Sequence, residues 1–152
     1  MKIEEKIKEL GIELPEAAKP AAMYVPVKQT GNLLFVSGQI PVKDGNMVYT
    51  GKAGADATLD DAIASTRLCA INIISAVKGF VGDLDRVKSI VKITAFIASE
   101  TGFDKQHLAA NGASQLLFDV FGEAGRHTRS AVAVNQLPLN ALTEVEAIIE
   151  IE

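Results

Sequence analysis

The sequence predicts a single α+β domain in which two long helices cover one face of a mixed β-sheet. Three observations support this fold class: two amphipathic helical stretches, several short β-rich stretches around them, and no repeat, low-complexity stretch or linker in the 152 residues. Apolar residues make up 48% of the chain, which is enough for a sizeable core. We therefore expect one domain over residues 1–152, with residues 1–20 as a short helical extension.

The two long helices are predicted from apolar residues that recur at helical spacing. The first is expected to begin at Thr58, where a Thr-x-x-Asp sequence resembles a capping box, and to end at Gly79. The second is expected to start near Phe103 and to end at Gly122. A shorter helix is expected over residues 2–10, ahead of both.

Stretches rich in β-branched and apolar residues predict the strands. They are expected at residues 24–28, 33–37, 47–49, 89–98, 129–135 and 142–151. The stretch 89–98 is apolar on both faces, as is typical of a central strand. A short turn joins the last two strands, so we expect an antiparallel hairpin in which Val134 lies opposite Glu144 and Arg129 lies opposite Ile149.

The last strand indicates that the sheet has two different faces. Its apolar residues alternate with polar ones, and the apolar set is Val145, Ala147, Ile149 and Ile151. Glu144, Glu146 and Glu150 point the other way, with Ile148 among them. Carboxylates in the middle of a sheet face need solvent, partners or a ligand site. The face without helices is therefore either solvated or covered by another molecule.

Composition argues against several classes of function. The net charge of -4 and the lack of Trp argue against a nucleic-acid partner. Cys69 is the only cysteine, so it cannot form an intrachain disulfide, and its apolar surroundings favour a buried small hydrophobe over a catalytic thiol.

Further patterns bear on metals and on location. Two histidines, His107 and His127, without a third ligand make a poor metal site, so no metal is expected. The apolar run 68–77 is too short to span a bilayer, and the first ten residues carry charges of both signs without an apolar signal region. We therefore expect a cytoplasmic protein with no membrane partner.

Three segments, taken together, resemble the RidA/YjgF family, which is also labelled endoribonuclease L-PSP. They are Gly31–Pro41 (GNLLFVSGQIP), Val91–Ile97 (VKITAFI), and Arg129–Ile148 with its RSAVAV, LP and EVEAI sequences. Their order and spacing over residues 22–151 carry the resemblance. The N-terminal helix and the longer middle region look like the subgroup of YjgF/chorismate-mutase-like endoribonucleases.

The resemblance implies a chorismate-mutase-like fold and a homotrimer whose sheets face inward around a central barrel. It also implies hydrolysis of reactive enamines and imines of the 2-aminoacrylate type to 2-keto acids and ammonia. The expected ligand is a small carboxylate or imino acid in a cleft between subunits. Relatives of this kind use no metal and no organic cofactor, so no cofactor is expected.

The resemblance places the catalytic residues at Arg129, Glu144 and Tyr24. Arg129 matches the carboxylate-binding arginine, and a guanidinium fork holds a carboxylate with two parallel hydrogen bonds. Glu144 matches the family's acidic residue, which would position a water and take its proton. Tyr24 matches an N-terminal tyrosine that would bond the ligand or close the cleft.

The ligand-binding positions implied by the resemblance are Ser37, Gly38 and Ala131. Ser37 and Gly38 match a pocket-lining loop, in which glycine permits close approach of the backbone. Ala131 stands where many relatives have a cysteine, so an oxidisable thiol is absent. His127, two residues before Arg129, is interpreted as a loop histidine.

Two alternatives to a deaminase stay open. A non-catalytic trimer that binds small carboxylate metabolites would need Arg129 but no activated water. The family label also suggests an endoribonuclease or translation inhibitor. The acidic composition and the lack of a clustered histidine or lysine site argue against RNA cleavage. Chorismate mutase activity would rest on analogy of fold alone.

Overall fold

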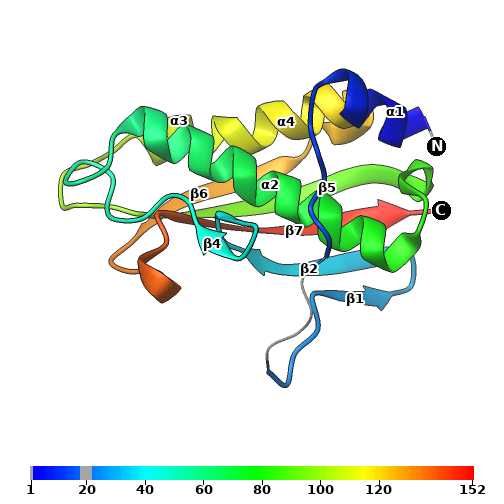
Figure 1. Cartoon of the computed structure of the whole chain (residues 1–152), viewed down its shortest axis with the longest axis horizontal. Coiled ribbons are helices and arrows are strands. Elements are labelled where there is room, and N and C mark those ends of the chain that lie inside the picture. The colour runs from blue at the N-terminus through cyan, green and yellow to red at the C-terminus, as the bar shows by residue number, and fades with distance from the viewer. Residues whose placement is uncertain (1, 18–21) are drawn as a thin grey trace.

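Five strands form one mixed sheet, and helices cover one of its faces (Figure 1). The structure is a computed structural model that describes residues 2–17 and 22–152. Across the sheet the strands follow the order β1 (Val27–Thr30), β2 (Leu33–Gln39), β7 (Thr143–Ile151), β5 (Val87–Ala98) and β6 (Thr128–Val134). Strands β5 and β6 run parallel, and the other neighbours are antiparallel. The predicted α+β class with a mixed sheet is confirmed.

The remaining elements connect and cover the sheet. The helices are α1 (Lys2–Glu9), α2 (Leu59–Val81), α3 (Gln106–Ala109) and α4 (Asn111–Phe121), and the short 3₁₀ turns are η1 (Leu84–Arg86), η2 (Gly122–Gly125) and η3 (Pro138–Asn140). A small hairpin of β3 (Val42–Lys43) and β4 (Asn46–Met47) turns at Asp44-Gly45, both with positive φ. The strand expected at 47–49 is therefore shorter and ends at Met47.

Helix α2 begins as predicted but ends later. The Thr58 hydroxyl accepts from the Asp61 N–H at 3.1 Å, and the Asp61 carboxylate accepts from the Thr58 N–H at 2.9 Å, which completes the capping box. The expected end at Gly79 is wrong, because the helix continues to Val81. Gly82, with φ 81°, donates its N–H to Lys78 O and caps the helix.

The predicted second long helix is divided into α3 and α4. The Thr66 hydroxyl, from α2, accepts from the Ala113 N–H at 3.2 Å and donates to Ala109 O at 2.6 Å. Without the hydroxyl, the Ala113 N–H would donate to Ala109 O as in a continuous helix. The Thr66 hydroxyl therefore replaces one backbone hydrogen bond of the helix at this point. Gly112 permits this close packing, because an added Cβ would lie 1.9 Å from Ile63 O.

The predicted hairpin between the last two strands is wrong. Strand β5 lies between β6 and β7, with Phe96 opposite Glu144 on one side and next to Val132 on the other. Arg129 lies beside Ile93, not opposite Ile149. The physical reason is that β5, a 12-residue strand whose Ile93, Ala95 and Ile97 are buried, is a central strand and takes a partner along each edge.

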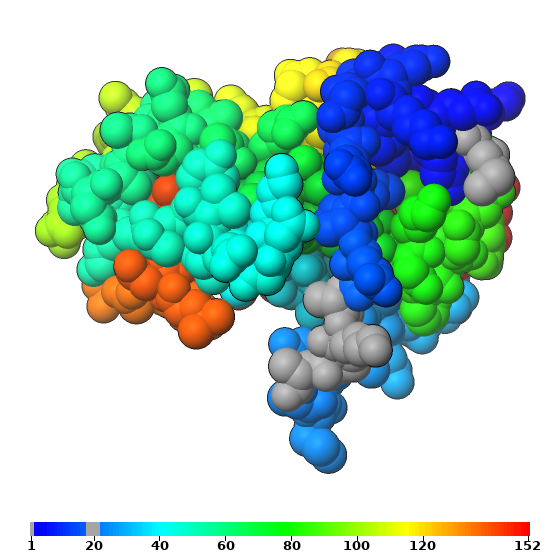
Figure 2. Space-filling view, in the orientation of Figure 1, coloured from blue at the N-terminus to red at the C-terminus, as the bar shows by residue number. Residues whose placement is uncertain are grey.

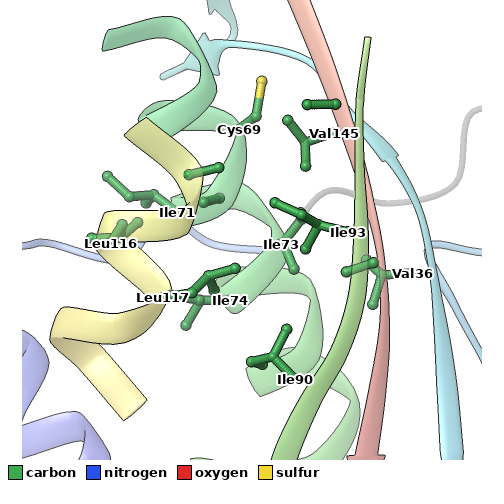
Figure 3. Packing of buried hydrophobic residues seen from close by; sticks show 14 of the residues in the cluster. Val36, Cys69, Ile71, Ile73, Ile74, Ile90, Ile93, Leu116, Leu117 and Val145 are labelled. Carbon is green, nitrogen blue, oxygen red and sulfur yellow. The ribbon is translucent and has the colours of Figure 1, made fainter. Parts of the chain in front are cut away.

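The main core fills the space between the sheet and the two helices α2 and α4 (Figure 3). Residues on α2 such as Ile73 and Ile74 meet Ile93 of β5 and Leu117 of α4, all at most 2% exposed. Cys69 also lies here, as predicted, and burial raises the pKa of its thiol to about 12, which makes it inert as a nucleophile at neutral pH. Helix α2 is long and apolar enough to cross a bilayer, but its buried residues make it a core helix.

The N-terminal extension packs across the helical layer, and Figure 2 shows it crossing the surface. Helix α1 is fixed by η1, because the Asp85 carboxylate accepts from the N–H groups of Lys2 and Ile3, both at 2.9 Å. Hydrogen bonds to the carboxylate, of which these two are a lesser part, hold the pKa of Asp85 at about 2. The end of the predicted 1–20 extension, residues 18–20, lies outside the described residues.

The second face of the sheet carries no helix from the described part of the chain. Phe35 of β2 and Val132 of β6 lie on this open face and are 41% and 44% exposed. The buried and exposed residues of β7 alternate as predicted, so Glu144, Glu146 and Glu150 share this face with Ile148. The expected trimer would cover this open face, and that expectation stays a prediction.

Candidate functional site

Arg129 extends from the helix-covered side of the sheet, at its edge strand β6. It lies beside Ile93, a fully buried residue whose side chain faces the helices. Its guanidinium donates through Nη1 to Asn111 Oδ1 at 2.8 Å and Ser114 Oγ at 3.1 Å, and through Nη2 to His107 O at 3.1 Å. No carboxylate among the described residues pairs with Arg129, so its charge is oriented but not neutralised by an acid of that part of the chain.

A short hydrogen-bond chain continues from Arg129 to His127. The Nδ1 atom of His127 lies 2.7 Å from Gly125 O, which can only accept, so Nδ1 carries the proton in the neutral ring. The Nε2 atom then accepts from the Ser114 hydroxyl at 2.9 Å, and Ser114 Oγ accepts from Arg129. Burial, with the nearby charge of Arg129, lowers the pKa of His127 despite the bond to Gly125 O. His127 is therefore part of this network.

A cavity of about 630 Å³ opens beside this network, between α4 and the chain that leads into β6. Arg129, His127 and Arg126 line it together with uncharged residues of α4, which include Asn111, Ser114, Gln115 and Phe118. No Asp or Glu belongs to the lining in the described part of the chain. The cavity is thus positively charged within a chain of net charge -4, which suits an anionic ligand.

Glu144 lies on the opposite side of the sheet, at the end of the open face. Strand β2 bulges between Val36 and Gln39 next to β7, and the side chain of Glu144 lies against Gly38. Partial burial raises the pKa of Glu144, and the charge of Glu146 on the same face raises it further. A carboxylate with a raised pKa is a better proton acceptor near neutral pH than an ordinary one.

Tyr24 lies on the loop that precedes β1. Figure 2 shows the blue segment that leads into β1 projecting from the body of the molecule. The strand expected at 24–28 begins at Val27, so Tyr24 is outside it and is 58% exposed. Ser37 anchors this loop: its hydroxyl donates to Val25 O at 2.8 Å and its N–H donates to Pro26 O at 2.9 Å. Ser37 therefore holds the chain beside Tyr24 in place.

Within one chain the predicted site residues fall into two groups. Ser37, Gly38 and Glu144 meet at the end of the open face, next to the Tyr24 loop. Arg129 lies on the other face with Ala131, which is partly buried beside Ala95 and packs against the core. One chain therefore does not bring Arg129 and Glu144 to one ligand.

Sequence reasoning missed two residues that orient Arg129, namely Asn111 and Ser114. Neither belongs to a recognisable motif, and their contacts depend on how α4 packs beside β6. The one available signal was the polar character of two positions three residues apart on an amphipathic helix, a signal that Gln115 and Asp119 of the same helix share.

Comparison with known proteins places this geometry in a family. The model of the family described as "YjgF/chorismate_mutase-like, putative endoribonuclease" matches residues 4–151. Protein TCP17 of Trypanosoma cruzi is 46% identical over 146 residues, which cover 95% of this chain and 91% of that protein. The crystal structure of Atu1372 from Agrobacterium tumefaciens, a protein of unknown function, is 46% identical with a TM-score of 0.93, covering 99% and 92% of the two chains.

More distant relatives carry names that describe a chemistry. A 2-iminobutanoate/2-iminopropanoate deaminase of Dermatophagoides farinae is 30% identical over 142 residues, which cover 93% of this chain and 95% of that protein. The structure of Escherichia coli TdcF with bound serine is 28% identical with a TM-score of 0.62, covering 90% and 94% of the two chains. The match over nearly the whole length, with the same mixed sheet and helical layer, shows that this chain belongs to the YjgF/chorismate-mutase-like family, which includes the RidA-type deaminases.

Proposed function

We propose that this protein hydrolyses small imino acids, and their enamine tautomers, to 2-keto acids and ammonia in clefts between the subunits of a homotrimer. The observation that carries the proposal is the guanidinium of Arg129, which three uncharged acceptors orient at a positively charged cavity. The deaminase named among the relatives acts on imino acids, and the TdcF structure holds an amino acid, which supports the same class of ligand.

In this proposal Arg129 binds the carboxylate of the imino acid. Two of its five N–H donors remain after the contacts with Asn111, Ser114 and His107 O, so the guanidinium can still donate to a ligand. Charge-assisted hydrogen bonds of this kind are stronger than neutral ones and fix the carbon next to the carboxylate. That carbon is the one that water must attack.

Glu144 supplies the base. Water adds to the imine carbon while one of its protons passes to the carboxylate of Glu144, and the carboxylic acid returns that proton to the nitrogen to complete the carbinolamine. The C–N bond of the carbinolamine then breaks, its nitrogen leaves as ammonia with the hydroxyl proton, and the keto group forms. General base help of this kind typically contributes about 10²–10⁴-fold. Because Arg129 and Glu144 lie on opposite faces of one sheet, the two residues would come from different subunits, with Tyr24 on its projecting loop closing the cleft.

The direct test is turnover of freshly generated 2-iminobutyrate, followed as ammonia or 2-oxobutyrate released above the spontaneous rate. Acceleration supports the proposal. Binding of 2-oxobutyrate without acceleration would favour the second candidate, a non-catalytic carboxylate binder. The observation that favours that candidate is the separation of Arg129 from Glu144 within each chain.

A further inference from the structure

A second guanidinium lines the cavity beside Arg129. Arg126 follows η2 directly, and its guanidinium carbon lies 5.5 Å from the centre of the Phe118 ring on α4. A cation over an aromatic face is attracted to the ring, and the contact restricts where the guanidinium can point. Arg126 is therefore positioned over the cavity wall, three residues before Arg129.

The charge of the cavity exceeds what one carboxylate can neutralise. Arg126 and Arg129 both line it, and the described lining residues include no acid. A ligand with one carboxylate on Arg129 would leave Arg126 with no acidic partner among the lining residues, and its ion pair with Glu123 lies outside that lining. The volume of about 630 Å³ lies in the range of ordinary ligand pockets, so it has room for a chain that extends beyond the first carboxylate.

The present partner of Arg126 can be displaced. Arg126 Nε lies 3.3 Å from Glu123 Oε2, and the two side chains are 71% and 80% exposed. Such exposed ion pairs contribute little, because water and salt screen them. A ligand carboxylate held nearby by Arg129 competes well, because its attachment at one end raises its effective concentration at the other.

We propose that the site prefers dicarboxylates: imino and keto acids whose α-carboxylate binds Arg129 and whose distal carboxylate binds Arg126. This inference rests on the proposed function for the role of Arg129 and adds the substrate class. Arg126 is the residue that selects chain length and charge, while Asn111 and Ser114 orient Arg129.

The test is calorimetric binding of two keto acids, 2-oxoglutarate and 2-oxobutyrate, to the full-length protein. We expect wild type to bind 2-oxoglutarate more tightly. Arg126→Gln should weaken 2-oxoglutarate binding by about tenfold, the typical worth of one charge-assisted hydrogen bond, and leave 2-oxobutyrate binding unchanged. Arg67→Gln is the matched control, because Arg67 is an exposed arginine of α2 outside this cavity and the variant has the same net charge.

The outcomes that would contradict only the dicarboxylate preference differ from those that would also contradict the proposed function. Equal affinity of the wild type for the two acids, or an equal loss for both in Arg126→Gln, would overturn the dicarboxylate preference and leave the proposed function standing. If neither acid binds the wild type, the role of Arg129 itself fails, and the proposed function fails with the inference. A loss in Arg67→Gln as large as that in Arg126→Gln would show a general charge effect and would also overturn the inference.

Discussion

The carboxylate of Glu144 lies directly against Gly38: an added Cβ at Gly38 would be 2.7 Å from Oε2 of Glu144 and 2.8 Å from its Cδ. The bulge in β2 and the absence of a side chain at Gly38 together make room for this acid at the end of the open face. Gly38, which was predicted to let a ligand approach the backbone, therefore also determines where Glu144, the predicted base, can lie.

Gly38→Ala should therefore move Glu144. The end of a glutamate side chain can rotate away, and Gly38 is not among the positive-φ glycines, so we expect the free energy of unfolding to change by less than about 1 kcal/mol. Imine turnover should fall by about tenfold or more, since a base must be within hydrogen-bond reach of its proton. Urea unfolding and initial rates measure the two effects.

Gly112→Ala gives the contrasting case. There the new Cβ would meet the backbone oxygen of Ile63, which cannot rotate away, so we expect a loss of about 1–3 kcal/mol or more in unfolding free energy. Gly38→Ala destabilised as strongly as Gly112→Ala, or with unchanged turnover, would contradict the role given to Gly38.

Arg129→Lys should weaken keto-acid binding markedly, by about tenfold or more, although the charge is kept. Lysine lacks the planar fork and cannot bond Asn111, Ser114 and His107 O while also presenting two parallel donors. Isothermal calorimetry with 2-oxobutyrate measures the change, with Arg67→Lys as the matched substitution on the surface of α2. Unchanged affinity in Arg129→Lys would mean that the fork is not what holds the ligand.

Three chains should assemble through the open sheet face. Light scattering at micromolar concentration is expected to report three times the mass of one chain. Val132→Glu should prevent this assembly, because it places a charge on that face, whereas Val48→Glu should not. The two valines are similarly exposed in one chain, at 44% and 47%, but Val48 lies beside α2 on the helical side. A stable monomer in the wild type would refute the cleft between subunits.

Mixed trimers test whether Arg129 and Glu144 act across subunits. Arg129→Ala and Glu144→Ala proteins should each be inactive, and unfolding and refolding them together should restore activity. With random assembly about a quarter of the clefts would receive both intact residues, one from each kind of chain. A mixture that forms trimers but stays as inactive as its parents would show that the two residues do not share a site.

The pH dependence of stability should report His127. Its pKa is lowered in the folded state, so below its ordinary pKa of about 6.5 the unfolded chain binds more protons than the folded one. The contribution of His127 to stability is therefore present at pH 7.5 and lost as the pH falls toward 5.5. His127→Gln should lose less stability over this interval than the wild type in urea titrations. Equal losses of stability in the wild type and in His127→Gln would mean that His127 takes up a proton as readily in the folded protein as in the unfolded chain.

The sequence by itself determined most of the local structure. The Thr58 capping box, the Asp44-Gly45 turn and the alternation along β7 depend on neighbouring residues and on a period of two or 3.6, so they can be predicted from spacing alone. The resemblance that singles out Arg129 and Glu144 depends on the order and spacing of three segments along the chain, so it too can be found without knowing the fold. Cys69 was predicted to be buried because its neighbours in the sequence are apolar, and it lies in the core.

The tertiary structure decided which strands are neighbours and which residues meet. The short turn after β6 predicted a hairpin, but β5 needs a partner on each edge, and it therefore separates Arg129 from Glu144. The division of α3 from α4 depends on the Thr66 hydroxyl, 43 residues before Ala109 in the sequence. The contacts of Asn111 and Ser114 with Arg129 could not be predicted from the sequence for the same physical reason. Contacts between distant segments depend on how whole elements pack, and the spacing of residues along one element does not specify that packing.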